Sequence, residues 1–137
     1  MRLAVAAGAA IACGVALAAP APRPAALADA APGQWEIAGV PGAQGPARQC
    51  VADLVALAQF EHRSKTCSRR ILSDTGSSAV VQYDCPAGGF GRTKMTVITP
   101  RSLRIETQGI SDGLPFNYVL QARRIGDCPF KDSAAAH

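Results

Sequence analysis

Cysteines are the residues of this chain best suited to chemistry, and their spacing directs that chemistry to disulfide formation. Apart from Cys13, the chain has four cysteines: Cys50, Cys67, Cys85 and Cys128. No two of these are closer than 17 positions, whereas redox sites generally use C-x-x-C and zinc sites pair their ligands at short spacing. An oxidised cysteine also cannot ligate a metal as a thiolate. We therefore predict two structural disulfides, with no metal site, no redox centre and no cofactor.

Other residue types that support catalysis lack the spacing that catalysis needs. His62 lies near Ser64, but no serine has a G-x-S-x-G elbow around it, so we expect a solvated histidine at the end of a helix. Glu106 and Asp112 would be a carboxylate pair for glycoside hydrolysis, but we expect Glu106 to pair with an arginine on a solvated face. The glycine-rich residues 87–91 lack the lysine and the helix of a phosphate loop and are expected to form a crossover or bulge. No catalytic residue is predicted, and the protein is not expected to be an enzyme.

Residues 1–28 have the pattern of a secretory signal peptide. Arg2 supplies a positive charge, residues 3–17 are apolar and uncharged, and A-x-A motifs end at Ala18 and Ala28. The apolar run is shorter than the roughly 20 residues of a membrane helix. We therefore predict export to the periplasm, cleavage after Ala18 or Ala28, and no membrane span once the leader is removed.

Residues 29–131 are predicted to be a single periplasmic domain of ordinary size, and residues 132–137 a disordered tail. The alternative to a removed leader is a membrane anchor, for which the apolar run is short. A separate alternative is a lipid-acceptor role for Cys13, but the apolar run continues past this residue through Leu17. Cleavage after Ala28 leaves twelve basic and ten acidic residues. Because no clustered basic patch with aromatics remains, nucleic acid is not an expected partner.

The first half of this domain is predicted to contain two short strands and one helix. Extended segments are expected at residues 34–37 and 47–50. A wide apolar band over residues 53–61 predicts a short α-helix. Asp53 lies at its start, where the helix dipole favours a carboxylate. We expect this helix to pack on one face of a sheet.

A first hairpin is predicted over residues 67–85. Folding the chain about Gly76 pairs Ile71 with Val81 and places the cysteines at the two ends of the hairpin opposite one another. Facing Cβ atoms lie about 4.5–5.5 Å apart, slightly wider than a disulfide prefers. A disulfide there needs the closer, non-hydrogen-bonded type of pair.

A second hairpin is predicted over residues 92–109. Matching the apolar faces of its strands pairs Val97 with Ile105 and Met95 with Thr107, which leaves a three-residue loop. We expect this register because it keeps the inward side chains together.

A last strand over residues 116–125 completes the predicted fold, after a turn at residues 111–113. Alternating strands joined by short turns are typical of an antiparallel meander. With one short α-helix packed on the sheet, the predicted fold class is α+β, stapled by disulfides.

The predicted topology favours one disulfide pairing over its rival. In a meander Cys67 and Cys85 lie at one end of the sheet and Cys128 at the other, which favours Cys67–Cys85 together with Cys50–Cys128. The rival pairing, Cys50–Cys67 with Cys85–Cys128, closes shorter loops, and the sequence alone does not exclude it. Each bridge would stabilise the domain by roughly 2–4 kcal/mol.

The order of these motifs resembles a known family. The matching segments are Trp35-Glu36 after Pro32-Gly33, Cys50 to Leu54, Cys67, Cys85, and Arg123 to Cys128. Together they resemble small secreted proteins of Gram-negative bacteria that are known as a domain of unknown function. Residues 99–112 resemble an alphaproteobacterial branch of it. The resemblance covers nearly the whole mature domain and implies a periplasmic location and an antiparallel sheet, but no reaction.

The functional hypothesis is a non-catalytic binding or interaction module of the cell envelope, with an envelope protein or a small ligand as its partner and a monomeric state. The expected contact surface consists of Arg101, Arg104 and Gln108, a polar stretch that structure alone explains least well. An apolar pocket between helix and sheet would be lined by Phe60, Tyr83 and Phe116. The alternatives are a small periplasmic hydrolase that uses His62 or Glu106, and a carrier of apolar ligands.

Overall fold

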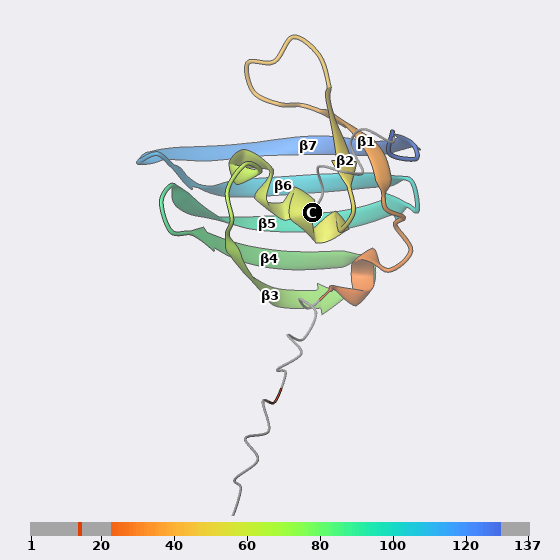
Figure 1. The fold of residues 1–137 in the computed structure, drawn as a ribbon, viewed down its shortest axis with the longest axis horizontal. Coiled ribbons are helices and arrows are strands. Elements are labelled where there is room, and N and C mark those ends of the chain that lie inside the picture. Colours follow the sequence, from red (N-terminus) through yellow and green to blue (C-terminus); the bar gives the residue numbers. More distant parts are fainter. Residues whose placement is uncertain (1–13, 15–22, 130–137) are drawn as a thin grey trace, which may run out of the picture.

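The computed structural model describes residue 14 and residues 23–129, in which an antiparallel sheet is crossed by one short helix (Figure 1). The strands are β1 Gly33–Ala38, β2 Ala47–Val51, β3 Ser68–Thr75, β4 Ser78–Cys85, β5 Gly89–Thr99, β6 Ser102–Ser111 and β7 Leu114–Gly126. Two 3₁₀ helices accompany them, η1 Ala25–Leu27 and η2 Leu54–His62. The predicted cut after Ala18 and the predicted tail at residues 132–137 lie outside the described residues.

The seven strands form a single sheet in the order β2-β1-β7-β6-β5-β4-β3. From β3 to β7 each strand pairs with the next along the chain, as predicted for a meander, and β1 then pairs with β7. The described fold is therefore mostly antiparallel β-sheet, with one helix of nine residues, η2, and one of three residues, η1. The predicted α+β class fits this fold only loosely.

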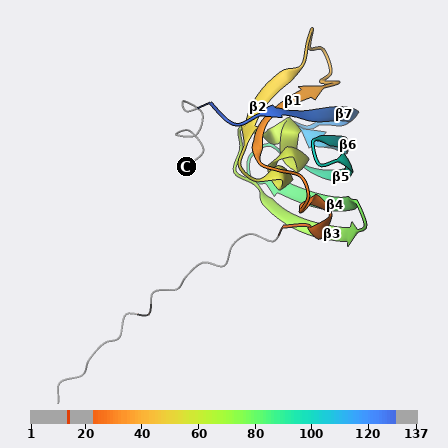
Figure 2. The ribbon, with the colours of Figure 1, turned by 90° about the vertical axis from the view of Figure 1, so that its right-hand side faces the viewer.

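The core lies between η2 and the concave side of the sheet, which curves around the helix (Figure 2). Alternating positions of the strands point inward there, as the period of two requires. The large side chains that are fully enclosed include Trp35, Ile37, Val81, Met95, Leu103, Ile105 and Leu120 from the sheet and Leu57 from η2. Each such side chain stabilises the fold by roughly 1.5–3 kcal/mol through burial.

The predicted α-helix is a 3₁₀ helix in the structure. Asp53 caps it by accepting a 3.2 Å hydrogen bond from the amide of Val55. The helical backbone is interrupted at Gln59, where φ is −102° and ψ is 34°. Just before this kink, the carbonyl of Ala58 accepts a 2.6 Å hydrogen bond from the buried Thr93 hydroxyl of β5. The helix is thus anchored to the sheet through its own backbone, a tertiary contact that the apolar pattern does not reveal.

The first predicted hairpin has the expected register. β3 and β4 pair Ile71 with Val81 and Arg69 with Tyr83, and the register shifts only beyond Ile71, on the way to the turn. Val81 and Tyr83 are fully buried, whereas most of β3 is exposed because it is the outer strand of the sheet.

The predicted register of the second hairpin is wrong by two residues. β5 and β6 pair Met95 with Ile105 and Val97 with Leu103, rather than with Thr107 and Ile105. Only two residues separate the strands, not three. Because side chains alternate with a period of two, a slip of two leaves every side chain on its own face. Matching apolar faces therefore could not decide between these two registers.

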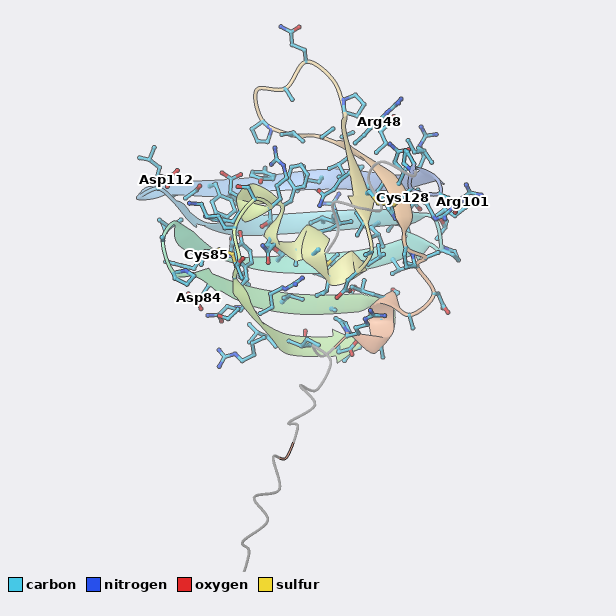
Figure 3. All side chains as sticks on the ribbon, viewed as in Figure 1. Arg48, Asp84, Cys85, Arg101, Asp112 and Cys128 are labelled. Atoms are coloured by element: carbon cyan, nitrogen blue, oxygen red, sulfur yellow. A yellow bond between two sulfur atoms is a disulfide. The ribbon has the colours of Figure 1, made fainter. Side chains whose placement is uncertain are left out.

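Two disulfides connect the pairs of cysteines that the predicted topology favoured. Cys50 in β2 is bonded to Cys128 after β7, with the Cα atoms 5.4 Å apart. Cys67 is bonded to Cys85 across the β3–β4 hairpin, with the Cα atoms 4.2 Å apart. Cys85 and Cys128 lie toward opposite ends of the sheet (Figure 3). The bridges therefore join separate regions of the fold.

Candidate functional site

His62 is buried, not solvated as the sequence predicted. Its side chain is 2% exposed, with Nδ1 3.0 Å from the Tyr83 hydroxyl and Nε2 2.9 Å from the carbonyl oxygen of Gly88. A carbonyl oxygen only accepts, so Nε2 carries the hydrogen and Nδ1 accepts from Tyr83. The ring thereby fastens the β4–β5 turn to η2. Both of its nitrogens are engaged, which leaves neither for a substrate.

The two tyrosines that interact with Glu61 and His62 at the end of η2 are held as neutral phenols. Burial raises the pKa of Tyr83 to about 12, and the negative charge of Glu61 adds to the effect. Burial also raises the pKa of Tyr118, whose hydroxyl donates a 2.6 Å hydrogen bond to Glu61. At neutral pH both hydroxyls are therefore hydrogen-bond donors within the fold.

The three residues predicted to line an apolar pocket do not surround a common cavity. Phe60 and Tyr83 are 2% and 0% exposed and belong to the packed interior. Phe116 is half-buried, and its ring lies edge-on to that of His62 at 6.0 Å between centroids. Of the three, only Phe116 also lines a hollow on the surface.

Two of these aromatic residues flank a pair of glycines in the middle of the sheet. Tyr83, Gly91, Gly109 and Phe116 are cross-strand neighbours in one row from β4 to β7. A Cβ atom on Gly91 would lie 2.5 Å from the Tyr83 ring, and one on Gly109 would lie 2.1 Å from the carbonyl oxygen of Phe90. Neither position has room for a side chain. Aromatic rings that cover glycines in this way stabilise the register of a sheet.

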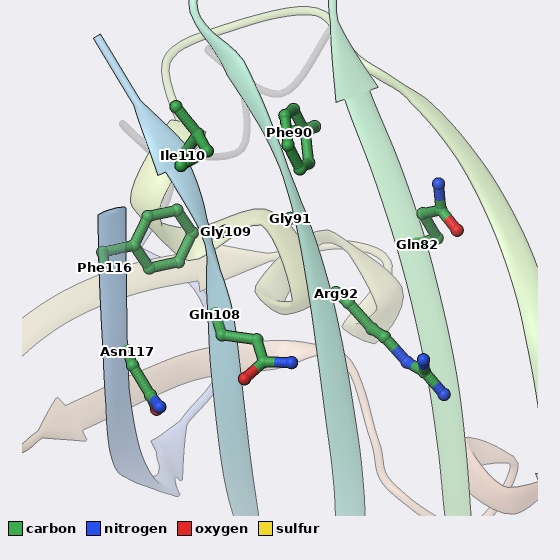
Figure 4. A pocket seen from close by; sticks show the side chains of 9 residues that line it. All are labelled: Gln82, Phe90, Gly91, Arg92, Gln108, Gly109, Ile110, Phe116 and Asn117. Atoms are coloured by element: carbon green, nitrogen blue, oxygen red, sulfur yellow. The ribbon is translucent and has the colours of Figure 1, made fainter. Parts of the chain in front are cut away.

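The face of the sheet opposite η2 carries a row of polar side chains directly beside these glycines. Gln82, Arg92, Gln108 and Asn117 are successive cross-strand partners on β4, β5, β6 and β7 (Figure 4). They line a hollow of about 530 Å³. The rest of its lining consists of Phe90, Ile110, Phe116 and the two glycines. The ring of Phe90 is 48% exposed, so the hollow combines hydrogen-bonding groups with an accessible aromatic surface.

A second hollow of about 380 Å³ continues along the same face and shares Arg92, Gln108 and Asn117 with the first. Its further lining residues are Val80, Lys94, Glu106, Thr107 and Val119. We call the two hollows together the outer groove. The carboxylate of Glu106 lies 3.3 Å from the guanidinium of Arg104. Within the described residues neither Arg92 nor Lys94 forms an ion pair, which leaves positive charge available in the groove.

The predicted contact surface is only partly brought together. Gln108 lies in the centre of the outer groove, and Arg104 lies on the same strand and face, where it pairs with Glu106. Arg101 lies in the β5–β6 turn, at the opposite end of the sheet from Asp112 (Figure 3). The pairing of Glu106 with an arginine is the one the sequence predicted.

Sequence reasoning missed Gln82, Arg92 and Asn117 as groove residues. Their alternation predicts the outward face, but the row exists only in the register that places Arg92 opposite Gln108. The predicted register would have placed Arg92 opposite Ile110 and broken the row. A correct β5–β6 turn length was the signal needed to find this site.

In the part of the chain that the structure describes, no three histidine, cysteine, aspartate or glutamate side chains gather as a metal site would require. None of the described helices has the length and apolar character needed to cross a membrane.

Comparison with known proteins places the fold in a family. The family model described as "Protein of unknown function (DUF3617)" matches residues 30–128. No curated protein and no solved structure matches the chain. The matched residues include all seven strands, η2 and both disulfides. Because the match spans well over half of the sequence and the whole sheet, this chain belongs to the DUF3617 family.

Proposed function

We propose that this protein is a non-catalytic binding module of the bacterial periplasm, and that its outer groove takes an extended saccharide bearing carboxylate groups. The observation that carries the proposal is the row of four polar side chains across four adjacent strands. Only one hydrogen bond engages this row within the described residues, a 3.4 Å contact from Arg70 to Gln82. The remaining donors and acceptors face the groove and are available to a ligand.

The chemistry of the row supports a ligand with hydroxyl and carboxylate groups. Side-chain amides both donate and accept hydrogen bonds, as sugar hydroxyls do. The guanidinium of Arg92 has the geometry to bind a carboxylate through two parallel hydrogen bonds. The exposed ring of Phe90 offers an apolar surface next to these polar groups, a combination typical of ligand sites.

The absence of catalysis is part of the proposal. The nitrogens of His62 are both engaged inside the fold. Among the residues that line the groove, Glu106 is the only carboxylate, whereas glycoside hydrolysis uses a pair. The A-x-A leader and the two disulfides support an oxidising, exported location.

Calorimetric titration tests the proposal with an oligogalacturonate and its neutral methyl ester as matched probes. We expect the acid to bind and the ester to bind at least tenfold more weakly. Replacing Arg92 with alanine should weaken binding of the acid at least tenfold, a change of about 1.4 kcal/mol. Arg101→Ala is the control, because it removes the same charge from the β5–β6 turn outside the groove.

Three outcomes would overturn the proposal. The acid could fail to bind, the ester could bind as well as the acid, or Arg101→Ala could weaken binding as much as Arg92→Ala does. The last result would indicate attraction by net charge alone, which salt would screen.

A further inference from the structure

We infer that the mature protein keeps residues 23–28, so that its leader is cut after Ala18 and not after Ala28. A signal peptidase would hydrolyse the Ala18–Ala19 peptide bond with one water molecule, leaving a carboxylate on Ala18 and an amino group on Ala19. The two A-x-A motifs are equally acceptable in the sequence. The inference goes beyond the proposed function, and the family match begins only at residue 30.

The first observation is a carboxylate that holds the amino-terminal segment to the sheet. Asp74, near the end of β3, accepts a 2.6 Å hydrogen bond from the amide of Ala25 and a 2.9 Å hydrogen bond from the amide of Ala26. These amides open η1, where a helix has backbone donors without partners of its own. One side chain thus satisfies two backbone groups from a segment 48 and 49 residues away.

The second observation is that the same segment belongs to the core. Ala26 and Leu27 are only 8% and 6% exposed, and Leu27 is part of the hydrophobic cluster that includes Leu54 and Val81. η1 lies beside the ends of β3 and β4 (Figure 1). Removing these residues would expose the apolar side chains that they now cover, which is unfavourable in water.

The third observation concerns the terminus that a cut after Ala28 would create. The new amino group would be charged and would lie next to Ala30, which is 6% exposed. A cut after Ala28 would also remove Arg23, whose guanidinium lies 4.0 Å from the carboxylate of Asp53 at the start of η2. A cut after Ala18 leaves all of these contacts in place.

Amino-terminal sequencing and intact mass of the full chain, exported in a Gram-negative host, test the inference. We expect the purified periplasmic protein to begin at Ala19. Ala18→Leu should abolish the amino terminus at Ala19, because signal peptidases need small residues at this position. Ala28→Leu is the matched control and should be processed like the natural chain, since Ala28 is exposed in the fold.

An amino terminus at Asp29, an uncut natural chain, or blocked processing of Ala28→Leu would overturn the inference. A second pair of variants tests the structural argument by itself. Asp74→Ala should lower the midpoint of chemical denaturation relative to Thr75→Ala, an exposed neighbour on the same strand. Equal midpoints would show that the segment is not held by Asp74. These measurements do not involve the groove, so their failure is distinguishable from failure of the proposed function.

Discussion

At the scale of single residues, the role of a side chain here follows from its partners and not from its type. Arg104 and Arg92 both point to the outer face, but Arg104 pairs with Glu106 while Arg92 has no ion-pair partner among the described residues. His62 would be a natural catalytic base in a cleft, yet its two nitrogens bond to Tyr83 and Gly88. Its contribution is to join the helix to a turn.

The raised pKa of the tyrosines gives a prediction for alkaline pH. The folded pKa of Tyr83 is about 12 against an ordinary 10.0, so folding favours the neutral phenol. The difference of about two pKa units adds roughly 2–3 kcal/mol to the free energy of unfolding. This contribution is fully present below pH 10 and is lost as the pH rises from 10 to about 12. Tyr118 shifts in the same direction because it is buried and donates to Glu61.

Spectrophotometric titration checks this directly, because the chain has only two tyrosines. At pH 10 we expect almost no tyrosinate in the folded protein and about half ionisation in the denatured chain. Tyr118→Phe isolates Tyr83, whose midpoint should lie near 12. A transition near pH 10 in the folded state would contradict the prediction.

At the scale of elements, the central strands owe their register to features that act only between strands. The row of Tyr83, Gly91, Gly109 and Phe116 allows one alignment of β5 and β6, because only glycine fits where the two strands face each other there. The same alignment places Arg92 opposite Gln108 on the other face. The inner packing and the outer groove are therefore two consequences of one register.

Replacing Gly109 with alanine should destabilise the protein by about 1–3 kcal/mol, the usual cost of overpacking. Its Cβ would lie 2.1 Å from the carbonyl oxygen of Phe90, so the backbone must move. Gly45→Ala is the control, since nothing lies within 4 Å of that position. Urea denaturation measures both, and equal stabilities of the two variants would disprove this role of Gly109.

At the scale of the whole molecule, strands from the two ends of the chain meet inside one sheet. β1 lies between β2 and β7, so the first and last strands of the sequence are hydrogen-bonded neighbours. The Cys50–Cys128 bridge links the same two regions covalently over a sequence separation of 78, whereas Cys67–Cys85 spans 18. The two bridges act on very different lengths of chain.

Removing the long-range bridge should cost more stability than removing the hairpin bridge. In the chain-entropy description the loss is roughly 4–5 kcal/mol for the Cys50–Cys128 loop and about 3 kcal/mol for the Cys67–Cys85 loop. The paired variants Cys50→Ala/Cys128→Ala and Cys67→Ala/Cys85→Ala, compared by urea denaturation, measure the difference. A larger loss from the hairpin pair would contradict this order.

Much of the fold could be predicted from local patterns. Alternating residues predicted the strands from β3 to β7 and their buried faces, because a strand with one face in the core repeats every two residues. The turn around Gly76 predicted the β3–β4 register, and the topology favoured the disulfide pairing. The β5–β6 register and the type of helix were predicted wrongly, since each depends on contacts with other elements.

By itself the sequence determined the strands from β3 to β7 and their inward faces, and the cysteines and leader motifs that indicate an exported chain. These features are local, because periodicity and spacing act within a few residues. Only the tertiary structure decided that His62 is buried, that Asp74 holds the amino-terminal segment, and that Arg92 lies between Gln82 and Gln108. Each of these depends on residues far apart in the chain meeting in one register, and a slip of two residues, which preserves every local pattern, would have removed the groove.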